Sequence, residues 1–176
     1  MEKVNRFEEA IDCYDKAIEL DPIDSLAYNN KGSALSDLNK NEDAIRCFDK
    51  AIELNPNDLL SYTKKGFALI KLKNFEEALQ FFDKVTELNP NYSLAYNNKG
   101  FAFYKLNSFE EALQFYDKAI KLDSSHFLAY YNKGLALLKL NRFEEALQCY
   151  DKAIELNPNF PEAIRDRKRI RNLMKK

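Results

Sequence analysis

One repeat period runs through the sequence and constrains its fold more than any other feature. All four glycines recur at equal intervals, and four of the five prolines keep the same interval. The glycines are Gly32, Gly66, Gly100 and Gly134, and the prolines in register are Pro22, Pro56, Pro90 and Pro158. Self-similarity of this kind predicts a stack of equal units, because one such unit is too small to bury its apolar face alone.

Each unit has the apolar pattern of two helices. Residues 128–140 form the first helix of the last unit, and residues 144–158 show one helical stripe. The stripe consists of Ala146, Leu147, Tyr150, Ala153 and Ile154. We expect Asn141 to cap the second helix, with Glu144 at its third helical position. Pro158 should end that helix, because proline disfavours helical backbone at the preceding residue.

The recurring residues resemble those of the tetratricopeptide repeat (TPR) family. In the first complete unit they are Tyr28, Lys31, Gly32, Leu35, Ala44, Phe48, Ala51 and Pro56. The interval agrees with the unit length of that family, about 34 residues. The pattern continues over residues 1 to about 160. The resemblance implies an all-α protein, a right-handed α-solenoid built of antiparallel helical hairpins.

The resemblance also divides the chain into parts of one continuous array. These parts are the second helix of an incomplete repeat at residues 1–24, complete repeats at 25–58, 59–92, 93–126 and 127–160, and a basic C-terminal capping helix at 161–176.

The residue before each glycine departs from the family pattern, which usually has leucine there. This chain has Lys31, Lys65, Lys99 and Lys133. We expect each lysine stem to pack along the helix, with its ammonium in solvent or paired with an acidic residue of a neighbouring helix. The recurrent candidates for that partner are Asp49, Asp83, Asp117 and Asp151.

Both ends of the chain differ from the internal units. Residues 5–20 match a second helix whose first helix is absent. Either the chain is a piece of a longer array, or this helix is covered by another copy, since its apolar side favours self-association. Residues 161–176 carry seven basic and two acidic residues, a local net charge of +5. We interpret them as a capping helix with a solvated outer face; contact with nucleic acid or an acidic partner is the less favoured alternative.

The sequence contains no recognisable catalytic or cofactor motif. The three cysteines lie at one repeat position and whole repeats apart, so they predict packing residues rather than a metal cluster. His126 is expected in a solvated loop. We therefore predict no enzyme, no cofactor and no metal. The net charge of −1 disfavours nucleic acid, and the lack of a signal peptide or a long apolar run predicts a cytoplasmic protein without membrane contact.

The TPR resemblance implies that the first helices line a concave groove. The predicted groove residues are Asn29, Asn30, Thr63, Lys64, Phe67, Ile70, Lys71, Asn97, Asn98, Phe101, Tyr104, Lys105, Tyr131, Asn132, Leu135, Leu138 and Lys139. Among them, Asn30, Asn98 and Asn132 share one repeat position. They resemble the asparagine ladders that hold a peptide backbone in members of the family, because a carboxamide both donates and accepts hydrogen bonds.

The predicted function is therefore a non-enzymatic scaffold that binds a peptide segment of a partner protein. Apolar and aromatic groove positions with lysines at their edge favour a segment that has hydrophobic and acidic residues. Leucine at the second position of every complete repeat does not match the basic residues of the two-carboxylate clamp found in heat-shock co-chaperones. The alternative function is self-association, with the unpaired N-terminal helix forming a homo-oligomer.

Overall fold

A computed structural model describes residues 2–174, and from residue 6 onward it also describes the side chains. Within that range the chain is helical and contains no strand, and it folds as two compact units, residues 1–89 and 90–176. The first unit has α1 (Glu2–Leu20), α2 (Ser25–Asp37), α3 (Asn41–Leu54), α4 (Leu59–Lys71) and α5 (Phe75–Leu88). The second has α6 (Ser93–Lys105), α7 (Phe109–Leu122), α8 (Phe127–Lys139), α9 (Phe143–Leu156) and α10 (Pro161–Leu173).

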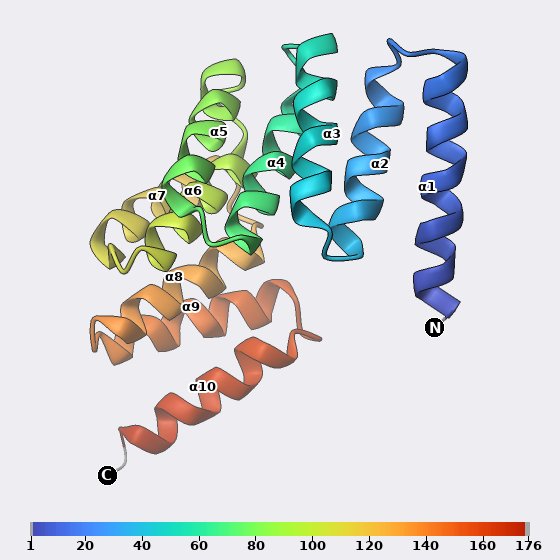
Figure 1. Cartoon of the computed structure of the whole chain (residues 1–176). Coiled ribbons are helices and arrows are strands. Elements are labelled where there is room, and N and C mark those ends of the chain that lie inside the picture. The colour runs from blue at the N-terminus through green and yellow to red at the C-terminus, as the bar shows by residue number, and fades with distance from the viewer. Residues whose placement is uncertain (1, 175–176) are drawn as a thin grey trace. The chain divides into compact units, whose positions relative to one another are not determined.

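Within each unit, successive helices pack as antiparallel hairpins (Figure 1). The first unit contains the hairpins α2–α3 and α4–α5, and α1 packs against α2. The second contains α6–α7 and α8–α9, with α10 packed on α9. The predicted all-α class of stacked helical hairpins is therefore confirmed.

A glycine and an aromatic ring define the distance between the two helices of each hairpin. A Cβ atom added to Gly32 would lie 2.7 Å from Cε1 of Phe48, and one added to Gly134 would lie 2.5 Å from Cε1 of Tyr150. Carbon atoms cannot approach so closely, so only glycine allows the helices this separation. The rings and the flanking alanines form the core; Ala44, Phe48 and Ala51 are at most 1% exposed.

The N-terminus of α9, the second helix of the last hairpin, differs from the prediction that Asn141 is its N-cap. Asn141 has a positive φ of 57°, the N-cap residue is Arg142, and α9 begins at Phe143. Asn141 lies after the end of the preceding helix, where the chain reverses through the left-handed region that asparagine tolerates better than most residues. The same conformation recurs at Asn39, Lys73 and Asn107.

Lysines that precede the glycines pair with an aspartate of the preceding second helix, which is one of the two arrangements that the sequence allowed. Lys65 pairs with Asp49, and Lys133 Nζ lies 2.6 Å from Asp117 Oδ1. Lys31 pairs in the same way with an aspartate of α1. The Lys65 stem is buried, and its ammonium lies 4.1 Å from the centroid of the Phe81 ring. This side chain of α4 therefore contacts α3 through Asp49 and α5 through Phe81.

The N-caps of the first helices differ between the two units. Asp24 Oδ1 accepts hydrogen bonds from the backbone N–H groups of Leu26 and Ala27 at 2.9 and 3.1 Å, and Asp58 caps α4 similarly. At the equivalent place before α8, His126 provides no side-chain cap. It is not the solvated loop residue that we expected, since its ring is half-buried and Nδ1 lies 3.4 Å from Ser93 Oγ. Burial lowers the pKa of His126.

The C-terminal helix α10 packs against α9 along one side. Pro161 occupies the first turn of α10, where its missing N–H is not needed. Ala163 and Ile170 are fully buried, whereas Ile164 and Leu173 remain exposed. Arg167 Nη1 lies 3.0 Å from Asp151 Oδ1 and repeats the lysine–aspartate pairing of the earlier hairpins. The predictions for Lys175 and Lys176 fall outside the described residues.

The left-handed backbone conformation of Lys73 can be tested by its effect on stability. Lys73 has φ 64°, where an L-residue other than asparagine or aspartate is strained. We expect Lys73→Asn to raise the free energy of unfolding by about 0.5–1 kcal/mol. The reverse exchange, Asn107→Lys, should lower it by a similar amount. Chemical denaturation of both variants measures these changes, and equal stabilities in all three proteins would contradict the assignment.

Candidate functional site

In the first unit, the faces of α2 and α4 form a partly apolar cavity. It has a volume of about 260 Å³. Phe67, 39% exposed, and the edge of Phe48 provide the apolar wall, while Lys64 and Lys71 provide positive charge. Asp37 lines the same cavity and partly offsets that charge. The arrangement places an accessible aromatic ring beside two ammonium groups.

Lys64 is held in this cavity by neutral groups. Its Nζ donates to Asn29 Oδ1 and to Ser33 Oγ, each at 2.6 Å. Burial lowers the pKa of Lys64, and the charges of Asp58 and Asp37 oppose the shift only in part. A cation that has lost hydration favours an additional anionic partner.

Lys71 is fixed in a comparable way at the exposed edge of the cavity. Its Nζ donates to the backbone oxygen of Ser36 at 2.7 Å and to Ser36 Oγ at 3.0 Å. These contacts connect the end of α4 to the end of α2. They orient the ammonium group while leaving the side chain exposed.

In each unit, an asparagine at the fifth position of a first helix, counted from Ser25 or Ser93, bonds a side chain of the neighbouring first helix. Asn29 is buried and its Nδ2 donates to Ser61 Oγ at 2.6 Å. In the second unit, Asn132 Nδ2 donates to Oδ1 of the buried Asn97 at 3.0 Å. These carboxamides therefore join adjacent helices, a role that the sequence pattern does not distinguish from ligand binding.

The predicted groove residues differ in their accessibility. Buried are Asn29, Thr63, Asn97 and Asn98; half-buried are Asn30, Lys64, Ile70, Phe101, Tyr104, Tyr131, Asn132, Leu135 and Leu138; exposed are Phe67, Lys71, Lys105 and Lys139. The three asparagines of the expected ladder thus lie in different surroundings. Asn98 is 1% exposed, so it does not present its carboxamide to a peptide in this conformation.

In the second unit, the first helices and α10 line a cavity of about 420 Å³. Tyr104, Leu135 and Leu138 form its apolar part. Asp166 and Arg169 of α10 also line it. Sequence reasoning missed these two residues because it interpreted α10 only as a cap. The repeat period could have predicted them, because α10 has the position of a further first helix. Counted from Pro161, Asp166 is its sixth residue and Arg169 its ninth.

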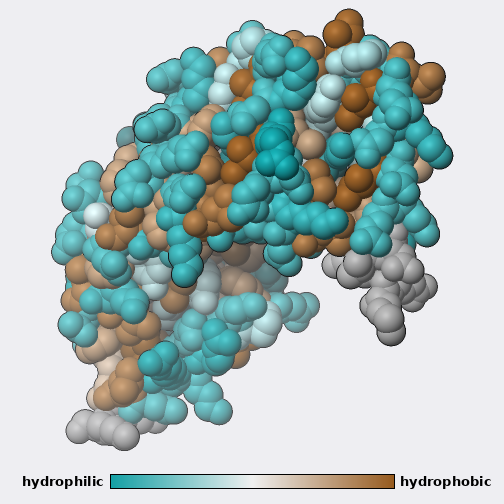
Figure 2. All heavy atoms as spheres, viewed as in Figure 1, coloured by the Kyte–Doolittle hydropathy of each residue, from teal (hydrophilic) through white to brown (hydrophobic). Residues whose placement is uncertain are grey.

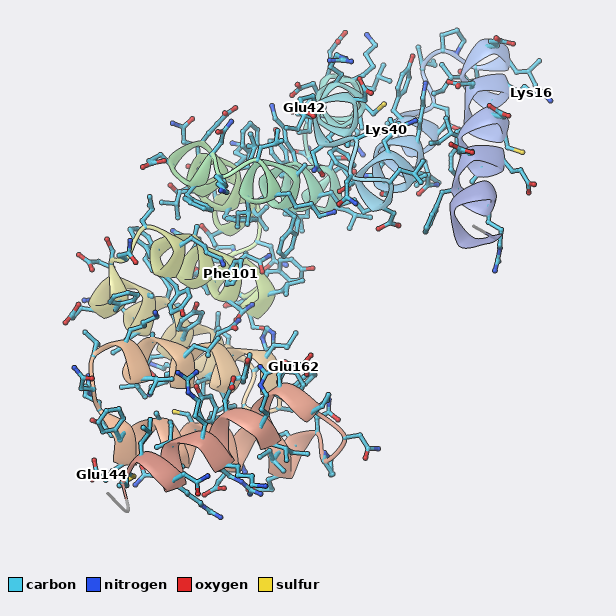
Figure 3. The ribbon with its side chains drawn as sticks, turned by 60° about the horizontal axis from the view of Figure 1, so that its bottom comes forward. Lys16, Lys40, Glu42, Phe101, Glu144 and Glu162 are labelled. Atoms are coloured by element: carbon cyan, nitrogen blue, oxygen red, sulfur yellow. The ribbon has the colours of Figure 1, made fainter. Side chains whose placement is uncertain are left out.

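Asp166 is the buried polar centre of that second cavity. Its Oδ2 accepts a hydrogen bond from the Tyr131 hydroxyl at 2.9 Å, and its Oδ1 accepts one from Arg165 Nε at 3.2 Å. Burial and the hydrogen bond to Asp166 raise the pKa of Tyr131. Tyr131 therefore remains protonated and connects α8 to α10. Elsewhere in this unit, Lys105 Nζ lies 5.0 Å from the centroid of the Phe101 ring, whose position Figure 3 labels.

The described residues offer no metal-binding cluster. Between residues 2 and 174, no three side chains of histidine, cysteine, aspartate or glutamate are grouped so that they could hold an ion. Cys13 is exposed, Cys47 half-buried and Cys149 buried, and all three are free thiols. Of the helices that the structure describes, none combines the length and apolar character needed to cross a bilayer.

The sequence pattern of the tetratricopeptide repeat matches this chain at residues 25–58, 60–92, 93–126 and 127–160. A related TPR pattern matches residues 3–38. The chain therefore belongs to the tetratricopeptide repeat family, whose members are protein-interaction modules. The comparison with curated proteins found no match.

Three solved TPR structures illustrate the similarity. YrrB, described as having an unusual peptide-binding site, is 30% identical, with 94% of this chain and 85% of that chain covered and a TM-score of 0.72. TTC0263 of Thermus thermophilus is 19% identical, with 94% and 91% covered and a TM-score of 0.81, which shows the fold alone. The first TPR domain of Spaghetti (RPAP3), bound to the HSP90 peptide SRMEEVD, is 27% identical, with 67% and 94% covered and a TM-score of 0.64.

The buried contacts of Asn29 yield a second stability test. In Asn29→Ala, Lys64 loses an acceptor and Ser61 loses a donor in a partly buried setting. We expect the free energy of unfolding to fall by about 1–3 kcal/mol. The neighbouring exchange Asn30→Ala is the control, with an expected change within about 0.5 kcal/mol. If denaturation gives the same loss for both variants, Asn29 does not join the helices as described.

Proposed function

We propose that this protein is a non-enzymatic scaffold that binds a peptide segment of a partner protein on its first helices. The observation that carries the proposal is the cavity of the first unit, where the accessible Phe67 ring lies beside Lys64 and Lys71. Such a site fits an apolar side chain and an acidic side chain that are close in the bound peptide. It contains polar groups that orient a ligand around a mainly apolar contact.

The acidic preference follows from the state of the two lysines. Both ammonium groups donate to neutral oxygens of serine or asparagine. A carboxylate that reached Lys64 would restore the electrostatic stabilisation lost on burial, and it would form a charge-assisted hydrogen bond. A hydrogen bond from an ammonium group to a carboxylate is charged on both sides, so it is stronger than the bonds to neutral oxygens that it would supplement.

In the second unit, the cavity lined by Tyr104, Leu135 and Leu138 offers a partner an apolar contact surface. Leu135 and Leu138 are half-buried beside Tyr104, and Lys139 is exposed at the same cavity. This surface fits hydrophobic side chains near an acidic residue. Asp166 and Arg169 bring charges of both signs, so the second unit is expected to discriminate among segments rather than to attract acidic residues alone.

The solved relatives agree with the peptide-binding class. YrrB has a peptide-binding site, and the Spaghetti domain was solved with the acidic peptide SRMEEVD. The present chain has exposed leucines at the second position of its first helices, including Leu26, Leu60 and Leu128. We therefore keep the prediction that it does not use a clamp with basic residues at that position, and we propose a hydrophobic anchor with acidic neighbours.

Calorimetric titration with a peptide that has a Leu-Phe centre flanked by glutamates tests the proposal. The double variant Phe67→Ala, Lys71→Ala should bind this peptide at least tenfold more weakly, because it loses the apolar anchor and one cation. Lys16→Ala is the matched control, since Lys16 points away from α2 on the outer side of α1 (Figure 3). Unchanged affinity in the double variant would contradict the assigned site.

The pH dependence tests the role of Lys64 independently. Its pKa is lowered in the free protein, so it loses its proton at a lower pH than an ordinary lysine. Binding of an acidic peptide requires the protonated form, and affinity should decrease as the pH rises through that pKa. A peptide with glutamine in place of glutamate should show no such decrease. Equal pH profiles for both peptides would exclude an ion pair with Lys64.

Self-association remains the second candidate function. The observation that favours it is the exposed apolar stripe of α1, which includes half-exposed Ala10 and Tyr14. Light scattering over a concentration series distinguishes an assembly from a monomeric scaffold. A monomer throughout that series would remove this candidate.

A further inference from the structure

A lysine and a phenylalanine are in contact at the same repeat positions in two of the hairpins. In the first unit, Lys65 Nζ lies 4.1 Å from the centroid of the Phe81 ring. In the second unit, Lys99 Nζ lies 4.5 Å from the centroid of the Phe115 ring. An ammonium group is attracted to the face of an aromatic ring, so each ring fills space beside a first helix and also provides a contact for the cation.

The hairpin of α2 and α3 has the lysine but not the ring. Lys31 is the equivalent of Lys65, and Cys47 stands one repeat before Phe81. Burial raises the pKa of Cys47, so its thiol is uncharged at neutral pH and acts as a small apolar group. A thiol in place of a phenyl ring leaves this part of the hairpin less filled than the next one.

A cavity of about 460 Å³ lies at this place, between α1, α2 and α3. Ile11 and Cys47 pack against the buried Leu35 and form its apolar part, and Tyr28 lines it from α2. Its volume is within the range of ligand sites, about 300–1,000 Å³. Figure 2 shows apolar side chains (brown) among hydrophilic ones (teal) over these three helices.

The charged side chains around the cavity are paired with one another. Lys31 pairs with Asp15 of α1, and Arg46 pairs with Asp43 within α3. These two ion pairs give the rim no net charge. The cavity therefore favours an uncharged side chain, because a charged one would bring a charge without a partner.

Lys65 shows that one ammonium group can make both kinds of contact. It pairs with Asp49 of the preceding second helix and also lies over the Phe81 ring. Lys31 makes the first of these contacts, with Asp15. An aromatic ring in the cavity would provide the second contact while the ion pair stays intact.

The cavity is not the place of another helix of the array. A first helix packs on the side of a second helix that contains its central aromatic residue, which is Phe48 in α3. That residue in α1 is Tyr14, whereas Ile11 and Asp15 line the cavity. In the next hairpin, which has α2 and α3 before it, Phe81 holds the corresponding place and is itself half-buried. A helix added before α1 would pack on the Tyr14 side and leave this cavity open.

This cavity and the one that contains Phe67 lie on opposite sides of α2. Tyr28 and Lys31 are three residues apart and share one side of the helix. Ser33 and Asp37, which line the Phe67 cavity, are four residues apart and share a side about half a turn away. Within the described part of the chain the two cavities share no lining residue, so they can be tested separately.

We propose that this cavity binds an aromatic side chain of a partner protein, whose ring lies under the Lys31 ammonium as the Phe81 ring lies under that of Lys65. The sulfur of Cys47 contacts the ring, which is favourable for a polarizable atom. The partner's residues beside the ring are uncharged, because the ion pairs of the rim are complete. This interaction does not depend on the peptide site proposed above.

An NMR titration of the ¹⁵N-labelled full chain with a neutral peptide, acetyl-Ser-Gly-Phe-Gly-Ser-amide, tests the proposal. We expect saturable changes of chemical shift at the backbone amides of Lys31 and Cys47. One ring offers a small contact area, so we expect a Kd of about 1 mM. The same peptide with alanine in place of phenylalanine should bind at least tenfold more weakly.

A third peptide separates the contact with the cation from apolar burial. Cyclohexylalanine in place of phenylalanine keeps the apolar volume but has no aromatic face. It should bind about threefold more weakly, because the attraction to the Lys31 ammonium is lost. Equal affinities of these two peptides would contradict a ring under Lys31. The peptide comparisons require no change to the protein, so they do not depend on the folding of a variant.

The variant Cys47→Phe supplies the missing ring from the chain itself. It should bind the phenylalanine peptide at least tenfold more weakly, because its own ring fills the cavity as Phe81 does in the next hairpin. Cys47→Ala is the matched control, since it leaves the cavity open and should keep the affinity. The double variant Phe67→Ala, Lys71→Ala should also keep it, which separates this site from the peptide site. Thermal melting confirms that the variants are folded.

Several results would overturn the proposal. One is the absence of saturable changes at Lys31 and Cys47, and another is undiminished binding to Cys47→Phe. Changes centred on Phe67 would assign the peptide to the other cavity. Shifts of the Cys47 amide that depend on the concentration of the free chain would assign the cavity to a side chain of a second copy instead of a partner protein.

Discussion

The contact between a glycine and an aromatic ring is the constraint on which the rest of the structure depends. It occurs in all four hairpins, with Phe48 or Phe82 in the first unit and Tyr116 or Tyr150 in the second. Because the ring occupies the space that a Cβ atom would need, the two helices approach at one distance and in one register. The buried alanines on either side extend this close packing along the hairpin. A side chain at any of these glycines would overlap the ring, so the ring or the helices would have to shift.

Polar side chains specify how neighbouring first helices align within a unit. Asn29 bonds Ser61 and Lys64 in the first unit, and Asn97 bonds Asn132 in the second. These side chains are buried or half-buried, so an incorrect alignment would leave carboxamides without partners. The contacts also orient Lys64 toward the cavity that contains Phe67. Asn29, at the fifth position of α2, thus helps to orient Lys64, at the sixth position of α4, for its proposed role in binding.

The two terminal helices have opposite surface chemistry. The outer side of α10 presents Lys168 and Arg171, while its buried side contacts α9 through Ala163 and Ile170. A charged face of this kind disfavours the stacking of another apolar helix on it. The helix α1 retains the alanines and the tyrosine that elsewhere receive a first helix.

The sequence by itself determined the repeat period, the paired helices and the glycine positions. These features depend on local spacing, which one sequence displays directly. Only the tertiary structure decided that Asn141 has left-handed backbone instead of a capping role, and that Asn29 and Asn97 are buried between helices. It also added Asp166 and Arg169 to a cavity of the second unit. Contacts between equivalent helices of neighbouring repeats depend on how side chains pack across the interface, and a polar residue in a helical pattern is compatible with either a ligand or a neighbouring helix.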